Sequence, residues 1–351
     1  MFTAELDHLL YPAHSQPRTF RTGFVVQTAV QHAAVVAALM PACVRLLFKN
    51  RDAHIRHPLL NSERRGQTDD TASHHHDAHK RSFSPIGSPM QRYTSGFMDR
   101  NPVNQILERE LEYHEKLYAG FAQGHFARPA VRDLRAHMVK RVLAKTGAGR
   151  ESRVLSLGCG IGDTELLLAP HVREVVGVDL SPTAIRQATQ DAASAGITNA
   201  RFEEGSLESI HGKFDVVIAI FLLHHLPDAI LHAAPALIRE RLTPGGKFYS
   251  LDPSRQRLSG MVGSILFPRL MEKYQSPDER QLDPEESAEY FRSAKFVCQT
   301  SMYDFVSSPL AGLFPGWKTG YLAARALDEL LIRTPGLNRL GSNFELLAWP
   351  S

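Results

Sequence analysis

Residues 153–181 read RVLSLGCGIGDTELLLAPHVREVVGVDLS, and this stretch decides the fold. It predicts an apolar strand, a turn with three glycines, a helix, and a second apolar strand that ends at Asp179. Gly158, Gly160 and Gly162 lack a Cβ, so the turn can adopt unusual φ values and a ligand can lie against the main chain. Asp179 is placed to accept hydrogen bonds from ribose hydroxyls. The pattern therefore predicts a site for a cofactor that contains a nucleoside.

A dinucleotide cofactor does not fit the same turn. The dinucleotide fingerprint G-x-G-x-x-G would place its third glycine at position 163, where this chain has Asp163. A carboxylate at the helix N-terminus would also repel a pyrophosphate. The glycine spacing therefore favours a mononucleoside cofactor.

Three further blocks follow in order: ARFEEGSLESI at 200–210, FDVVIAIFLLHHLPD at 214–228 and LTPGGKFYSLDPS at 242–254. Together with the glycine turn, this series resembles class I S-adenosylmethionine-dependent methyltransferases. The resemblance implies an α/β fold: a seven-stranded, Rossmann-like, mostly parallel sheet whose last strand is antiparallel, with helices on both faces. We assign the late helix to residues 283–294, the sixth strand to 295–305 and the seventh to 343–350.

The resemblance also implies S-adenosylmethionine as the cofactor and a set of residues that contact it. These are Gly158, Cys159, Gly160, Gly162, Asp179, Leu180, Ser206, Leu207, Ile220 and Tyr113. Two positions depart from the family pattern, because Ser156 and Ser206 stand where acidic residues are usual. Loss of charge there weakens cofactor binding by about 1 kcal/mol per site, unless Glu204 or Glu208 substitutes at the second position.

For catalysis, the family resemblance implies an in-line displacement in which the acceptor atom takes the methyl group from the sulfonium. A general base is needed only if the acceptor must lose a proton. His225, His224 and Asp252 follow the fourth and fifth strands and are the candidates, with structural roles as the alternative. We expect no metal site, since no Cys or carboxylate cluster completes the histidine run at 74–76.

Two helices are predicted before the first strand, in the segment 98–150 of a domain that spans 98–351. The second begins at Pro129 and stops at Gly147. Leading helices of this kind cap the cofactor in class I methyltransferases, which makes Tyr113, His114 and Tyr118 candidate lid residues. Ordinary packing of one helix face is the alternative.

A helical insertion is expected at 306–342, and a similarly apolar segment lies at 258–274. Exposed apolar side chains there would build an acceptor pocket or dip into a membrane interface, with Trp317 and Tyr321 at headgroup level. In the membrane interpretation Lys318, Arg325 and Arg333 would face anionic lipid. The third interpretation is a packed helical subdomain or a dimer interface.

Residues 1–97 differ in composition from the rest of the chain. They carry the basic excess behind the net charge of +3, and 50–97 has little apolar periodicity, so we expect a largely disordered extension. The apolar stretch 22–44 contains Gln, His and Pro, which disfavour a membrane span or anchor. The alternatives are a helical soluble extension and a mis-assigned start, with Met98 as the native start. Three cysteines in 351 residues indicate no disulfide framework and favour a cytoplasmic location, with peripheral membrane contact as a further expectation.

These features predict methyl transfer to a small, hydrophobic or lipid-like acceptor. The alternatives are a protein methylase and a catalytically silent module that binds cofactor or membrane. A nucleic-acid acceptor is not expected, because no Asn-Pro-Pro-Tyr-like motif follows the fourth strand and no basic patch is interleaved with aromatics.

Overall fold

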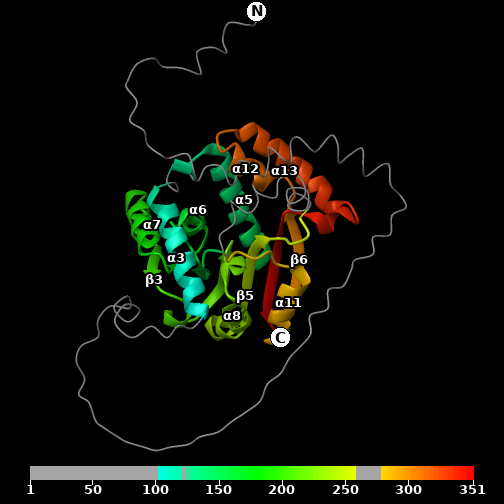
Figure 1. Ribbon diagram of the computed structural model, residues 1–351. Helices are drawn as coiled ribbons and strands as arrows, with labels where there is room; N and C mark the ends of the chain where they lie inside the picture. The colour runs from blue at the N-terminus through cyan, green and yellow to red at the C-terminus, as the bar shows by residue number, and fades with distance from the viewer. Residues whose placement is uncertain (1–101, 121–123, 126, 258–277) are drawn as a thin grey trace, which may run out of the picture.

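The protein is described from a computed structural model, which covers residues 102–120, 124–125, 127–257 and 278–351. Seven strands form one sheet in the order β3-β2-β1-β4-β5-β7-β6 (Figure 1). Their bounds are β1 Arg153–Leu157, β2 Glu174–Asp179, β3 Ala200–Glu204, β4 Phe214–Ile220, β5 Leu242–Pro253, β6 Phe296–Asp304 and β7 Asn343–Pro350. The first five strands pair in parallel, and β7 is antiparallel to both β5 and β6. The predicted fold class is confirmed.

The central strands are apolar on both faces, as a parallel sheet between two helical layers requires. Side chains alternate along β1, so Val154 belongs to one hydrophobic core and Leu155 to the other. The first core includes α5 (Pro129–Thr146) and α6 (Asp163–Leu168). The second includes α8 (Asp228–Arg241) and α11 (Pro284–Ser293). The sheet is therefore covered on both sides, and its strand ends are left to form a site.

Helix α3 (Pro102–Gly120) reaches the carboxyl ends of the parallel strands. Glu115 on α3 accepts hydrogen bonds from the hydroxyls of Ser181 and Thr183, at the start of α7 (Pro182–Ser194) beyond β2. Helix α5 starts at Pro129 and ends at Gly147, which adopts a left-handed φ of 76°. Both predicted leading helices are present, and α3 is fixed where it can line a ligand site.

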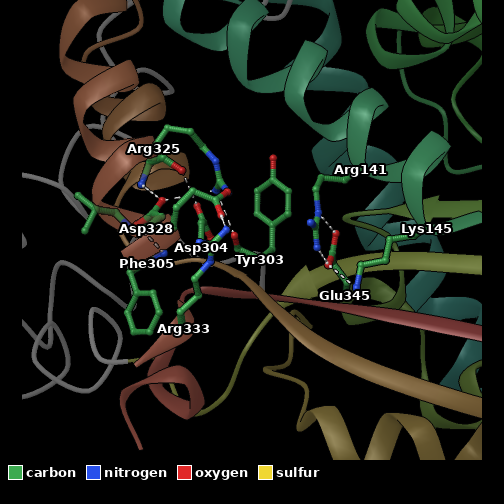
Figure 2. Close-up of polar contacts among 12 residues, drawn as sticks. Arg141, Lys145, Tyr303, Asp304, Phe305, Arg325, Asp328, Arg333 and Glu345 are labelled. Atoms are coloured by element: carbon green, nitrogen blue, oxygen red, sulfur yellow. Dashed lines mark hydrogen bonds and ion pairs between the residues drawn. The ribbon is translucent and has the colours of Figure 1, made fainter. Parts of the chain in front are cut away.

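Residues 306–342 contain α12 (Ser307–Leu313), α13 (Lys318–Arg333) and the short helix η5 (Leu337–Leu340). Figure 1 places α12 and α13 on the opposite side of the domain from α7 and β3. The Asp328 carboxylate on α13 accepts backbone N–H groups of Phe305, Val306 and Ser307 at 2.9–3.0 Å (Figure 2). This carboxylate therefore ties α13 to the end of β6 and the start of α12.

The structure corrects what the sequence suggested about exposure in this insertion. Tyr321 is buried and packs in the α5 core, so it cannot lie at headgroup level. Arg325 is largely covered and contacts the Tyr303 carbonyl and Glu329. The turn between α12 and α13 docks on α5, whose Ala130 N–H donates to the Pro315 carbonyl at 2.8 Å. The sequence suggests that Tyr321 is exposed, because polar and small residues precede it. On α13, however, Tyr321 lies on the helix face that packs against the core containing α5.

Several expectations fall outside the described residues. These are the disordered extension, the alternative start at Met98, the histidine run at 74–76 and the apolar segment at 258–274. Within the described part, no helix combines the length and hydrophobicity needed to cross a bilayer.

Asp328→Ala should lower the free energy of unfolding by about 3 kcal/mol, because three buried N–H groups lose their acceptor together. Glu329→Gln, one residue later and half exposed, is the matched control and should cost less than about 1 kcal/mol. Urea unfolding measures both. Equal destabilisation by the two variants would contradict the anchoring role of Asp328.

Candidate active site

A cavity of about 370 Å³ lies between α3 and the turns that follow β1, β2, β3 and β4. The turns contribute Gly158, Asp179, Leu180, Gly205, Ser206, Leu207 and Glu208 to its lining. The part of the lining that comes from α3 and α8 is mostly aliphatic. Open α/β sheets bind ligands at this carboxyl edge.

The glycine turn after β1 allows other elements to close around it. Gly158, Gly160 and Gly162 have φ values of 63°, 52° and 74°, in the left-handed region that L side chains rarely adopt. A Cβ on Gly160 would lie 2.7 Å from the Tyr118 hydroxyl, and one on Gly158 would lie 2.7 Å from the Leu222 side chain. The turn therefore requires glycine for its conformation and for the approach of these two side chains.

Asp179 joins the two turns that flank the cavity. Its carboxylate accepts the Gly160 N–H at 2.8 Å and the Ser181 N–H at 2.9 Å. Burial raises the pKa of Asp179, while these two bonds oppose the shift. Each carboxylate oxygen keeps acceptor capacity, and the residue lines the cavity. The arrangement fits the ribose hydroxyls of a nucleoside.

Each of the two serines that depart from the family pattern donates a hydrogen bond to an acidic side chain. Ser156 donates to the Glu165 carboxylate of α6 at 2.6 Å, and burial raises the pKa of Glu165 to about 7. Ser206 donates to Glu208, which also lines the cavity. The sequence suggests Glu208 as a substitute for the missing charge. It does not suggest Glu165, because only the fold brings this helix residue against β1.

Three ionisable side chains that line the cavity lie close together. The Nδ1 atom of His225 lies 3.1 Å from Glu110 Oε2, and His114 Nδ1 lies 2.8 Å from the Glu110 backbone carbonyl and 3.7 Å from Oε2. Glu110 is 6% exposed, and burial lowers the pKa of His114. Ligand atoms of the three residues lie within 4.8 Å of one another, close enough to share either a proton or a metal ion. The sequence drew attention to His225 and His114 but missed Glu110, four residues before His114 on the same helix face.

Residues 154–246 match the family model described as "Methyltransferase domain". The chain carries a class I S-adenosylmethionine-dependent methyltransferase domain. S-adenosylmethionine is accordingly its cofactor, and the glycine turn with Asp179 is where the residues fit its nucleoside.

Relatives of this methyltransferase domain act on different acceptors. The uncharacterised methyltransferase YcgJ of Bacillus subtilis is 32% identical over 32% of this chain and 45% of its own length. A ubiquinone biosynthesis O-methyltransferase of Albidiferax ferrireducens is 30% identical over 41% of this chain and 59% of its own. A 23S rRNA (uracil-C5) methyltransferase of Aeromonas salmonicida is 36% identical over 30% of this chain and 24% of its own length. The chain therefore spans less than two thirds of each of these relatives, which include both small-molecule and RNA methyltransferases.

Some of the predicted cofactor residues of the methyltransferase domain line the cavity and others support it. Gly158, Asp179, Leu180, Ser206 and Leu207 contribute to the lining. Cys159, Gly160, Gly162, Ile220 and Tyr113 do not. Cys159 and Ile220 are buried in the protein, whereas Tyr113 is 37% exposed. Of the candidate lid residues, His114 and Tyr118 face the cavity instead of Tyr113, because they lie four residues apart on one face of α3.

The predicted catalytic residues also separate into two groups. His225 lines the cavity, whereas His224 and Asp252 are buried behind it, with Nδ1 3.0 Å from Oδ1. Burial, reinforced by His225, lowers the pKa of His224. The two histidine rings lie 4.0 Å apart between centroids. His224 and Asp252 therefore support the ring of His225.

Asp179→Ala should weaken S-adenosylmethionine binding at least tenfold, or about 1.4 kcal/mol, because the ribose hydroxyls and two backbone N–H groups lose their acceptor. Calorimetric titration measures the dissociation constant. Glu203→Gln on the neighbouring β3, outside the cavity lining, is the control and should bind normally. Wild-type affinity in Asp179→Ala would contradict the assigned cofactor site.

Proposed function

We propose that this protein transfers a methyl group from S-adenosylmethionine to a hydroxyl group of a small, largely apolar acceptor. One observation carries the proposal: a single cavity is lined by the nucleoside turns, by aliphatic side chains of α3 and α8, and by the Glu110–His225 pair. A methyl acceptor must meet the cofactor inside this cavity.

The lining supports a small molecule over a nucleic acid. Val103, Leu107, Leu111, Leu226 and Ile230 belong to the lining, and burying such surface favours an apolar ligand. No lysine or arginine is among the lining residues in the described part of the chain, although phosphate contacts dominate nucleic-acid affinity. Similarity to a ubiquinone biosynthesis O-methyltransferase agrees with an apolar acceptor that carries a hydroxyl group.

The bound cofactor supplies an activated methyl group on its sulfonium, so the chain must position the acceptor and remove its proton. Glu110 Oε2 lies 3.1 Å from His225 Nδ1, so its negative charge stabilises the imidazolium that forms when His225 takes the acceptor proton. The buried His224–Asp252 pair keeps the His225 ring in place. Aliphatic walls exclude water from the acceptor while the transfer takes place.

Peripheral membrane contact is a separate and smaller proposal. After the burial of Tyr321 and Arg325, it rests on Phe314 and Trp317, which are 42% and 53% exposed at the turn between α12 and α13. Aromatic side chains at such a turn suit the bilayer interface. Lys318, also proposed to face lipid, pairs with Asp133 at 3.3 Å.

His225→Ala should reduce kcat/KM for alkylphenol acceptors about 10²- to 10⁴-fold at neutral pH, since the base is lost. Glu110→Gln should give a smaller loss, because the base itself stays and only the charge that stabilises its protonated form is removed. His232→Ala, on the exposed face of α8, is the matched control and should behave as wild type.

The same assay separates proton transfer from metal catalysis. Treatment with a chelator should leave the wild-type rate unchanged, because the proposal requires only the side chains. If the chelator abolishes activity and a divalent metal restores it, the general-base mechanism is wrong. The result would indicate instead a metal ion held by Glu110, His114 and His225. A wild-type rate in His225→Ala would also contradict the base assignment.

A further inference from the structure

We infer that the acceptor is an amphiphile: its hydroxyl-bearing head lies at the Glu110–His225 pair, and a flexible hydrocarbon chain of roughly eight carbons fills the chamber between α3 and α8. This inference rests on the proposed function and adds the class of substrate. It also assigns Leu107 and Ile230 as the residues that determine chain length.

The lining of α3 changes character along one face of the helix. Residues three or four positions apart share a face, and the cavity is lined at 103, 107, 111, 114 and 118. The positions toward the C-terminal end, His114 and Tyr118, lie near the cofactor turns. The positions toward the N-terminal end, Val103 and Leu107, are aliphatic. One helix face thus passes from a polar head region to an apolar tail region.

Helix α8 presents a matching face to the same cavity. Ile230, Ala234, Leu237 and Ile238 follow the same helical spacing, and all four side chains are apolar. With the aliphatic part of α3, they make a chamber that offers no hydrogen-bonding side chain to the middle of a ligand. Asn104 supplies the polar group among the lining residues before Glu110, and it is exposed, as expected at the mouth of the chamber.

The dimensions of α3 set the length of chain that fits. Glu110 lies seven positions after Val103, which at 1.5 Å per residue corresponds to about 10 Å along the helix. An extended hydrocarbon advances roughly 1.25 Å per carbon, so about eight carbons span that distance. A compact aromatic acceptor would leave this part of the cavity without contacts, whereas a chain would bury its surface there.

The experiment uses the full chain with a series of 4-alkylphenols, from methyl to dodecyl, and measures their dissociation constants in the presence of S-adenosylhomocysteine. Affinity should rise about fourfold for each added carbon up to roughly eight carbons and then level off. Leu107→Trp should lower the ratio of octylphenol to methylphenol affinity at least tenfold, because the indole fills the chamber. Ile230→Phe, on the facing helix, should shift the same ratio in the same direction.

Glu108→Trp is the matched control, since residue 108 is exposed on α3 and outside the lining; its ratio should equal that of wild type. Binding of S-adenosylhomocysteine within about twofold of wild type establishes that each variant is folded. Affinity independent of chain length, or equal ratios in Leu107→Trp and Glu108→Trp, overturns the inference.

Methyl transfer from radiolabelled cofactor, measured on the same phenols, distinguishes the two proposals. Length-dependent binding without transfer supports the chamber and contradicts the proposed function. Transfer without length dependence supports the proposed function and contradicts the chamber.

Discussion

The site depends on the buried carboxylate of Asp179, which joins the turn after β2 to the turn after β1. Asp179 lies 19 positions after its hydrogen-bond partner Gly160 in the sequence. By accepting the N–H groups of Gly160 and Ser181, it fixes the loop after β1 against the loop after β2. The parallel sheet brings both loops to the same edge, and glycine at 160 leaves room for Tyr118 of α3. The position of α3, and therefore the shape of the cavity, follows from this contact and from the bonds of Glu115 to Ser181 and Thr183.

The cavity combines two environments that a methyl transfer to an apolar hydroxyl compound requires. At the turns, backbone amides, carboxylates and Ser206 suit a nucleoside, whereas aliphatic side chains of α3 and α8 suit a hydrocarbon. A buried carboxylate is costly unless it is paired, and Glu110 has His225 at 3.1 Å. In the proposed function, this pair takes the proton of the acceptor in a cavity whose remaining lining is largely aliphatic.

Local sequence signals predicted the first strands, the glycine turn and the helix boundaries at Pro129 and Gly147, because these depend on periodicity, glycine conformation and proline geometry. The seven-stranded sheet with its antiparallel last strand was predicted from the resemblance to class I methyltransferases. Contacts between distant elements could not be read in the same way. Glu110 meets His225 only after α3 has docked over the sheet, and Glu165 reaches Ser156 only once α6 lies beside β1. The helices of the insertion were predicted, but the exposure expected of Tyr321 was wrong, because the sequence does not show that the turn between α12 and α13 docks on α5.

A crystal structure of the full chain with S-adenosylhomocysteine and an alkylphenol tests the central claim most directly. The account predicts ribose hydroxyls on the Asp179 carboxylate, the cofactor sulfur facing the Glu110–His225 pair, and the phenol oxygen between that sulfur and His225. A ribose held away from Asp179, or a sulfur facing away from Glu110 and His225, would contradict it.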